Sequence, residues 1–362
     1  MGGELELKEI LLLGNGYDLC HNLPTKYTDF LKYISKGGYE EIGVYSSYLL
    51  DEFKKLIYDN FWIEYFSNKQ YESDNWIGFE GEMRYVIAEI EEALKNYKPE
   101  IDYFLEFSDN YLDELIEKHV GVNDIQKIYY DSLCLIRAYE IYICACVNTV
   151  KVYSECEDLA NLKPDDVITF NYSDTFERIH DGDFFNIYHV HGKAKQEANL
   201  HTTNIVLGID EYLPDGEESK NLQFVRFKKY FQRLQKHNDA DYLLLIDDIR
   251  KKWELTSASV QENYRESLCH EGGYTIPGVS DVAAHLTIFG HSLGETDGDI
   301  LSSLICNDNV QTTIYYKDED TYALQLINLI KIIGKKEVLK RTGGSTRTIW
   351  FTRQKSNKNQ EI

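Results

Sequence analysis

A short glycine turn, Gly14-Asn15-Gly16, directly follows the apolar run Ile10–Leu13 near the start of the chain. Glycines at such a place allow positive φ and let the backbone approach a ligand closely. Successive N–H groups at a turn between a strand and a helix also form a concavity that binds anions. The sequence therefore predicts a phosphate-binding turn, and Asp18 just beyond it would either cap the turn or hold a ribose hydroxyl.

Two well-known phosphate-binding motifs do not fit this turn. The dinucleotide pattern G-x-G-x-x-G requires glycine where Leu19 stands, and no convincing ribose-binding acid follows about 20 residues further on. The P-loop pattern requires Gly-Lys followed by Ser or Thr, and the turn has no such sequence. The alternative that this turn only joins a strand to a helix and binds nothing stays open at this point.

Asn171 and His191 follow two further strand-like runs. An Asn at a strand end often only forms a turn, but its amide donates and accepts at once and can position a water and a sugar hydroxyl. His189 and His191 share one face of their predicted strand, with no carboxylate or cysteine at metal-ligand spacing. A general base is therefore favoured over a metal site or a structural pair, and His191 is the better base because it ends the strand beside Gly192.

The segment Gly290-His291-Ser292-Leu293-Gly294 formally fits the G-x-S-x-G pattern of serine hydrolases. In that pattern an acid and then a His follow the serine, and no His occurs after His291, so an esterase is disfavoured. Polar clusters instead end three strand-like runs, after Leu13, Phe170 and Phe289. Because ligands bind beyond the carboxyl ends of strands in open α/β sheets, these clusters would form one pocket.

The elements that must position these residues are runs of apolar or β-branched residues spaced far apart in the chain. Several runs are continuous rather than alternating, as expected for strands covered by helices on both faces. We predict an α/β, Rossmann-like fold with a mostly parallel sheet and large helical insertions. The predicted strands are 10–13, 167–170, 185–190, 205–207, 286–289 and 312–316, with a possible edge strand at 346–352.

Helical spacing of apolar residues occupies much of the rest of the chain. The predicted helices are 25–34, 48–66, 80–97, 124–153 and 224–236. Glu80 and Glu82 begin one of them, where acids favour the positive helix end, and no chemistry is expected of them. The predicted domains are a Rossmann-like unit of residues 1–36 plus 161–352, a helical subdomain inserted at 37–160, a second insertion at 218–270 and a polar tail at 353–362.

The charge of the chain limits its partners. At pH 7 the 362 residues carry a formal net charge of -23, which disfavours general binding to duplex nucleic acid or anionic membranes. Residues 331–362 are the exception, with nine Lys or Arg against two Asp or Glu. This basic end is either solvated or docked on the acidic body, or it contacts a nucleic acid or a partner protein.

The seven cysteines are odd in number and contain no C-x-x-C pair. A structural zinc site and a disulfide framework are therefore not expected, no metal is predicted, and a reducing cytosol is favoured. No apolar stretch reaches the length of a membrane span, and the first residues do not have the charge pattern of a signal peptide. We expect a cytoplasmic protein without a membrane partner.

Several motifs together resemble the AbiH family of bacteriophage abortive-infection proteins. The matching segments are 13–25 (LGNGYDLCHNLPT), 169–177 (TFNYSDTFE), 190–192 (VHG), 205–210 (IVLGID) and 289–294 (FGHSLG). They cover most of the chain in the expected order, and the first is quite specific. The resemblance implies a bacterial anti-phage effector of abortive infection.

The same order of motifs resembles, more distantly, the sirtuin-like NAD-binding domains of bacterial defence proteins. In that resemblance Gly14 and Gly16 match the dinucleotide turn, Asn171 the amide and His191 the base, while Gly290-His291-Ser292 matches the late loop. Two residues depart from the pattern. Asn15 stands between the glycines in place of a small residue, and Ser173 takes the place of an Asp.

The resemblance implies NAD as the substrate, cleaved at the nicotinamide–ribose bond. The glycine turn would hold the diphosphate, Asn171 the ribose and a water, and His191 would withdraw a proton. A zinc subdomain of the deacylase type is absent, which argues against a protein deacylase. The alternative function is a nucleotide-binding sensor that does not turn NAD over and acts through a protein or nucleic-acid partner. Assembly into a homo-oligomer and a phage-derived trigger are further expectations from the resemblance.

Overall fold

Six parallel strands form a single sheet in the computed structural model, in the order β3-β2-β1-β4-β5-β6. The strands are β1 (Lys8–Leu13), β2 (Asp166–Thr169), β3 (Asn186–His189), β4 (Ala284–Phe289), β5 (Val310–Tyr316) and β6 (Ile349–Arg353). This order is that of the Rossmann fold, so the predicted class is confirmed. The structure describes residues 7–68, 76–96, 112, 125–152, 155–181, 183, 185–209, 222–236, 241–251, 282–307, 309–344 and 347–355.

The central strand β1 is apolar on both faces, which is why it lies inside the sheet. Its last four residues, Ile10–Leu13, are all buried, as expected for a strand covered from both sides. Ile10 and Leu12 pack with α13 (Gly298–Ile305), α14 (Glu319–Ile333) and the helix over residues 242–251. On the other face, Leu11 and Leu13 pack with α9 (Thr175–Ile179).

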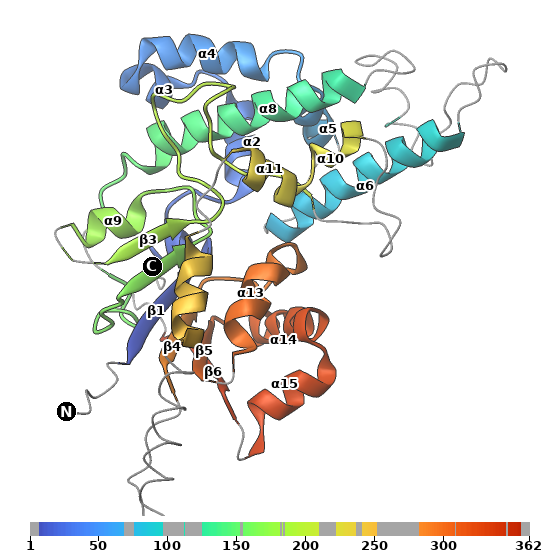
Figure 1. The fold of residues 1–362 in the computed structure, drawn as a ribbon. Coiled ribbons are helices and arrows are strands. Elements are labelled where there is room, and N and C mark those ends of the chain that lie inside the picture. Colours follow the sequence, from blue (N-terminus) through green and yellow to red (C-terminus); the bar gives the residue numbers. More distant parts are fainter. Residues whose placement is uncertain are drawn as a thin grey trace, which may run out of the picture.

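The described helices between β1 and β2 form a layer beyond the ends of the strands, at the top of Figure 1. An aromatic core, including the buried side chains of Tyr27, Phe53, Trp62 and Phe79, holds this layer together. Its helices are α1 (Gly16–Cys20), α2 (Tyr27–Lys36), α3 (Glu40–Tyr45), α4 (Ser47–Ile57), α5 (Phe61–Asn68), α6 (Trp76–Asn96) and α8 (Ile125–Tyr142), the last extended by a π-helical turn at Ile143–Val147. The remaining named helices are α10 (Leu222–Val225), α11 (Lys229–Gln235), a 3-10 turn at Glu295–Asp297 and α15 (Lys335–Thr342).

The helix predicted over 48–66 is wrong as a single element, because the chain breaks between α4 and α5. Asp59 has a φ of 50°, a left-handed conformation that an α-helix does not contain. Asn60 then starts the next helix: its side-chain oxygen accepts hydrogen bonds from the N–H groups of Trp62 and Ile63 at 3.0 and 3.2 Å. An Asn at this point satisfies N–H groups that have no partner inside the helix.

The strand predicted at 205–207 is also wrong, since this segment is not part of the sheet. Its side chains are buried in the helical core, which accounts for their apolar character. Its backbone is bonded mainly to side chains: Tyr172 Oη donates to Val206 O at 2.8 Å, and Leu207 N–H donates to Gln232 Oε1 at 3.1 Å. Burial explains an apolar run as well as strand pairing does.

The helix predicted at 224–236 is also wrong as a single element, because the structure divides it into α10 and α11 with no helix at 226–228. The other predicted elements differ from the structure mainly at their ends. The helix predicted at 124–153 ends as an α-helix at Tyr142, and residues 124 and 153 lie outside the described part. The predicted edge strand is present as β6, at the end of the sheet. The division into subdomains at 37–160 and 218–270 stays a prediction, and residues 252–281 lie outside the described part. Among the described helices, none has the length and apolarity needed to cross a bilayer.

Candidate functional site

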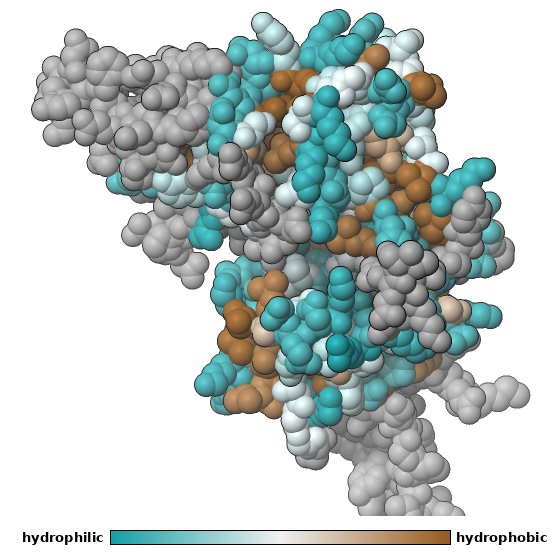
Figure 2. Space-filling model, turned by 180° about the vertical axis from the view of Figure 1, so that it is seen from behind, coloured by the Kyte–Doolittle hydropathy of each residue, from teal (hydrophilic) through white to brown (hydrophobic). Residues whose placement is uncertain are grey.

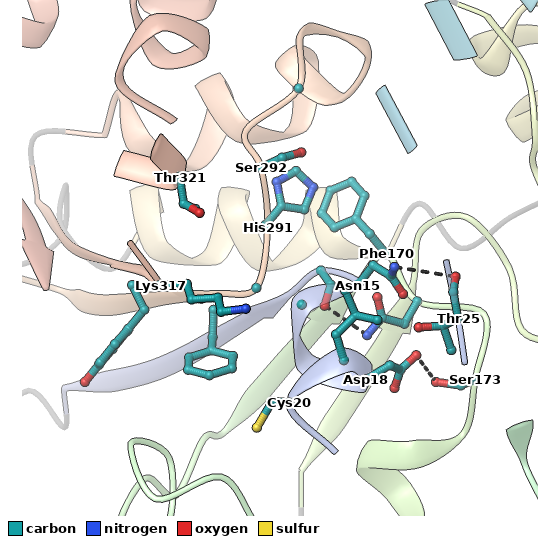
Figure 3. Close-up of a pocket in the computed structure, with 18 of the residues that line it drawn as sticks. Asn15, Asp18, Cys20, Thr25, Phe170, Ser173, His291, Ser292, Lys317 and Thr321 are labelled. Atoms are coloured by element: carbon teal, nitrogen blue, oxygen red, sulfur yellow. Dashed lines mark hydrogen bonds between the residues drawn. The ribbon is translucent and has the colours of Figure 1, made fainter. Parts of the chain in front are cut away.

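A cavity of about 490 Å³ lies at the carboxyl ends of β1, β2 and β4. The strand order reverses between β1 and β4, and open α/β sheets bind their ligands at such a point. In Figure 3, Asn15 and Asp18 follow β1, Ser173 follows β2 and Ser292 follows β4, around one hollow. All site residues predicted from the sequence line this cavity: Gly14, Asn15, Gly16, Asp18, Asn171, His191, Gly290, His291 and Ser292.

The glycines of the first turn are needed for contact with the loop after β4. A Cβ on Gly14 or Gly16 would lie 2.6 Å from backbone atoms of Gly290 or His291. Gly290 itself has a φ of 69°, and a Cβ there would lie 2.4 Å from the nitrogen of Tyr17. The Gly16 N–H donates to Gly290 O at 2.8 Å, so this amide is already used within the protein. The two loops therefore form one rigid floor for the cavity.

Asp18 lies in α1 and is buried, with 1% of its surface exposed. Its Oδ2 accepts a hydrogen bond from Ser173 Oγ at 2.7 Å (Figure 3), while within the described part Oδ1 has no hydrogen-bond partner. Burial raises the pKa of Asp18 to about 6, although hydrogen bonds from Ser173 and Thr175 oppose the shift. The carboxyl is thus a buried group able to bind a hydroxyl of a ligand.

Asn171 ties the end of β2 to the glycine turn. Its Nδ2 donates to Gly14 O at 3.1 Å, and its backbone N–H donates to Thr169 Oγ1 at 3.1 Å. The side chain is 6% exposed and borders the cavity. These bonds fix the amide in one orientation, with the Nδ2 group directed at the turn.

His191 lies beside a buried carboxylate that the sequence did not indicate. His191 Nε2 is 3.0 Å from Asp297 Oδ1, and both side chains are nearly buried. The two atoms are close enough for a hydrogen bond, but their angles are not those of one. The interaction between His191 and Asp297 is therefore mainly electrostatic. Burial lowers the pKa of His191, and Asp297 only partly offsets this, so the imidazole is neutral at pH 7. The negative charge beside Nε2 favours the tautomer that carries its proton there and leaves Nδ1 as the basic nitrogen.

His291 approaches the same carboxylate but has both ring nitrogens engaged. Its Nδ1 accepts a hydrogen bond from the Leu293 N–H at 3.0 Å, and its Nε2 lies 3.5 Å from Asp297 Oδ2. Nδ1 must be unprotonated to accept, so the proton sits on Nε2 and faces Asp297. Phe170 contacts both imidazoles, with ring centroids 5.0 Å from His191 and 4.4 Å from His291. His291 is therefore suited to hold Asp297 in place, and His191 to exchange a proton.

Lys229 completes a buried charge network around Asp297. Its Nζ lies 3.2 Å from Asp297 Oδ1 and 2.9 Å from Glu80 Oε1, and each of the three residues is less than a tenth exposed. Burial opposes the ionisation of Asp297, but Lys229 and His191 hold its pKa well below the usual range. The interpretation of Glu80 as a helix-end acid without further role is wrong, because its carboxylate pairs with Lys229 at the cavity.

The model of the bacteriophage abortive infection family AbiH matches residues 10–317. The chain belongs to the AbiH family. Membership of this family implies a role in bacteriophage abortive infection, as the sequence motifs predicted. No curated protein and no solved structure matches the chain. The AbiH match includes the glycine turn after β1, the ends of β2 and β3, and the loop after β4 that carries Asp297.

Three residues of this AbiH site were missed by sequence analysis: Glu80, Lys229 and Asp297. Asp297 lies six positions after His291, so its place in the loop after β4 was a usable signal. Lys229 and Glu80 come from α11 and α6, which are remote in the chain from the strands whose ends form the cavity. Nothing local in the sequence distinguishes them from surface charges.

Basic side chains border the opposite part of the cavity. Lys317 follows β5, and Arg353 and Lys355 come from the end of β6 and the residues after it. Part of the basic end of the chain therefore lies at the site. Lys355 is not free of acidic neighbours, since its Nζ is 3.6 Å from Glu157. Glu157 and Asp158 line the cavity as well, so the charge on this side is mixed, and a phosphorylated ligand would be attracted by Lys317 and Arg353.

Cys20 and Cys156 also line the cavity, and the structure joins them in a disulfide. The expectation that the cysteines form no disulfide is wrong for this pair. The two residues are 136 positions apart, and only the packing of α1 beside the segment that leads into β2 brings them together. Spacing in the sequence cannot reveal such a pair.

Proposed function

We propose that this AbiH protein hydrolyses NAD to ADP-ribose and nicotinamide and thereby acts as an abortive-infection effector. The observation that carries the proposal is the pair His191–Asp297, which lines the same cavity as Asn171 at the reversal point of a Rossmann sheet. A neutral histidine beside a buried carboxylate is an arrangement suited to a general base. The distant sirtuin resemblance of the same motifs supports NAD as the substrate.

The dinucleotide would bind with its diphosphate at the Gly14–Gly16 turn and beside the adjacent basic side chains. The Gly16 amide is already bonded to Gly290, so phosphate binding would depend on the other turn amides and on Lys317 and Arg353, which line the cavity. Asn171 would orient the nicotinamide ribose with its amide oxygen, because its Nδ2 donates to Gly14. Holding the ribose and a water in this way supplies much of the rate through positioning.

In the reaction, the bond between C1′ and the nicotinamide nitrogen breaks, and both electrons leave with nicotinamide. A water oxygen forms the new bond to C1′, and its proton passes to Nδ1 of His191. Asp297, held ionised by Lys229, stabilises the imidazolium that results. A ribose hydroxyl could transfer its proton to the same nitrogen, which would aid departure of the leaving group.

A nucleotide-binding sensor is the second candidate function. One observation favours it: Asn171 Nδ2 donates a hydrogen bond to Gly14 O in the glycine turn, as a structural residue would. In this function NAD or ADP-ribose binds without turnover, and the helical layer acts on a partner protein or nucleic acid.

Self-association, a phage-derived trigger and a cytoplasmic location stay predictions. Exposed apolar residues support the first of these. They include Leu324, Ile327 and Leu339 on α14 and α15, and Figure 2 shows apolar side chains along one edge of the lower half of the molecule. Exposed apolar patches often mark contact surfaces between proteins.

The test is to incubate purified protein with NAD and to measure nicotinamide and ADP-ribose by chromatography. Wild type should release both in equal amounts, and Asn171→Ala and His191→Ala should abolish the release. His189→Ala is the matched control, because His189 ends the same strand but pairs with Glu177 at 2.9 Å. Full activity in His191→Ala would remove His191 as the base. Binding of NAD without release of nicotinamide would favour the sensor.

A further inference from the structure

Four side chains of types that zinc commonly binds lie near the end of α1, and two of them, Cys20 and Cys156, line the cavity. Cys20 ends α1, His21 follows it, and Glu155 and Cys156 precede β2. Ligand atoms of Cys20, His21 and Cys156 all lie within 4.8 Å of one another. Figure 3 shows Cys20 projecting from the short helix, on the side away from Thr25.

We propose that, once its disulfide is reduced, the pair Cys20 and Cys156 binds one zinc ion together with His21 and Glu155. Two thiolates, one imidazole and one carboxylate make a complete tetrahedral set for this metal. The site is separate from the proton-transfer residues His191 and Asp297, and the inference does not depend on the proposed NAD chemistry.

The ligand atoms of three of these residues already lie close enough together for one metal ion, and Glu155 lies outside that group. His21 Nε2 lies 3.6 Å from Cys156 Sγ. Zinc–sulfur and zinc–nitrogen bonds of about 2.3 and 2.1 Å at a tetrahedral angle place these two atoms about 3.6 Å apart. His21 Nε2 is 3.8 Å from Glu155 Oε1, a separation that a small rotation of the carboxylate would shorten. The two sulfurs must separate, because they are bonded to each other in the disulfide, and the Glu155 carboxylate must turn toward them.

The surroundings of Glu155 are those of a metal ligand held by a second layer of hydrogen bonds. Its Oε2 accepts hydrogen bonds from Tyr17 Oη at 2.9 Å and from His180 Nε2 at 2.6 Å. Such partners orient a carboxylate and are typical around bound metals. Oε1 accepts a hydrogen bond from the Cys156 N–H at 2.6 Å and lies 3.8 Å from His21 Nε2, and the side chains of His21 and Glu155 are both less than a tenth exposed. The cluster is therefore shielded from bulk water on several sides.

Reduction and metal binding form a balanced sequence. A dithiol reductant transfers two electrons and two protons to the disulfide, which becomes two thiols, and the reductant is oxidised to its own disulfide. Zinc then binds both sulfurs as thiolates, and the two thiol protons are released. The metal would tie α1, which carries Asp18, to the segment that leads into β2, just as the disulfide does. A reducing cytosol, which the cysteine usage favours, would populate the zinc form.

Cobalt is the direct probe, because Co²⁺ in a tetrahedral thiolate site gives a sulfur-to-cobalt charge-transfer band and intense visible bands. Protein reduced with a phosphine under argon should bind one Co²⁺ per chain with these bands, and Zn²⁺ should displace it. Cys20→Ser and Cys156→Ser should lose the charge-transfer band. Cys306→Ser is the matched control, since Cys306 is an exposed cysteine outside any disulfide, and it should keep the band.

A second measurement uses the unmutated chain and so does not depend on how the variants fold. Wild-type protein with its disulfide intact should give no thiolate-to-cobalt band with Co²⁺. Reduction of the same protein should be sufficient for the band to appear. Zinc content measured by mass spectrometry should follow the same pattern, with one ion per reduced chain. The inference is overturned if reduced wild type shows no band, or if Cys20→Ser retains it. Nicotinamide release plays no part in either readout.

Discussion

Gly16 and Gly290 lie in such close contact that neither can carry a side chain. A Cβ built on Gly16 would lie 2.6 Å from Gly290 Cα, and one built on Gly290 would lie 2.8 Å from Gly16 Cα. The two residues follow β1 and β4, neighbouring strands between which the sheet order reverses. Their contact sets the distance between the loop that carries Asp18 and the loop that carries Asp297.

Gly290→Ala should therefore destabilise the protein more than a substitution by alanine at a glycine that has positive φ but open space around it. Gly37 is the matched control, since its φ of 67° is close to the 69° of Gly290 but nothing lies within 4 Å of its Cβ position. Gly37→Ala should cost about 1–2 kcal/mol for its backbone conformation, and Gly290→Ala clearly more. Urea unfolding measures both, and equal losses would show that the two loops separate without cost.

Removal of Lys229 tests the buried charge network. Lys229→Met leaves the carboxylates of Glu80 and Asp297 buried without their cation, which should cost about 3–5 kcal/mol of unfolding free energy. Lys193→Met is the control, because the pair of Lys193 with Glu177 is partly exposed and exposed pairs contribute less than about 1 kcal/mol. Similar losses in both variants, measured by chemical denaturation, would contradict a network that depends on burial.

Asp18 should make the protein less stable as the pH rises from about 4 to about 6. Its folded pKa is raised to about 6 from 3.8, so the folded state holds this proton more tightly than the unfolded chain. The resulting stability is present below pH 4 and is lost as the pH rises through 6, by up to about 3 kcal/mol. Asp18→Asn should abolish this part of the pH dependence of the unfolding free energy.

Asp318 offers a control of opposite sign for that measurement. Hydrogen bonds from Thr321 at the start of α14 lower the pKa of Asp318, so its contribution is present above its unfolded pKa and is lost as the pH falls. Asp318→Asn should therefore flatten only the acid side of the stability profile. A profile of Asp18→Asn that parallels wild type between pH 4 and 6 would contradict the raised pKa of Asp18.

The pH dependence of NAD hydrolysis tests the role of Asp297. The base must be neutral, so activity should fall as the pH drops through the pKa of His191, which burial lowers below its usual 6.5. Asp297→Asn removes the charge that raises this pKa. The fall of activity on the acid side of the pH profile (the acid limb) should therefore move to lower pH, and the maximal rate should decline. His191→Ala should lose about 10²–10⁴-fold in rate. An acid limb that moves to higher pH in Asp297→Asn would contradict the role given to Asp297.

The sheet and the convergence of its strand ends were predictable because both follow from local pattern and a general rule. Continuous apolar runs such as Ile10–Leu13 indicate buried parallel strands, and the carboxyl ends of such strands meet at one edge. Asn171 and His191 could be assigned to the same cavity on that ground alone. Their chemical roles are not decided by their position and stay predictions.

The residues that were missed depend on contacts between segments remote in the chain. Glu80 looks like any acid at a helix start, and only its pairing with Lys229, about 150 residues later, distinguishes it. The disulfide of Cys20 and Cys156 has the same origin. The apolar character of residues 205–207 led to the wrong prediction of a strand, because their side chains are buried in the helical core. The local sequence indicates that a segment is buried, but it does not indicate which distant element covers that segment.

The central claim is that one dinucleotide lies across the ends of β1, β2, β3 and β4, and a structure of the protein soaked with NAD tests it most directly. Asn171→Ala crystals would trap uncleaved substrate if the wild type turns it over. The account predicts density for the diphosphate at Gly14–Gly16 and for the nicotinamide ribose between residue 171 and His191. NAD bound elsewhere, or a cavity that stays without nucleotide at saturating NAD, would contradict it.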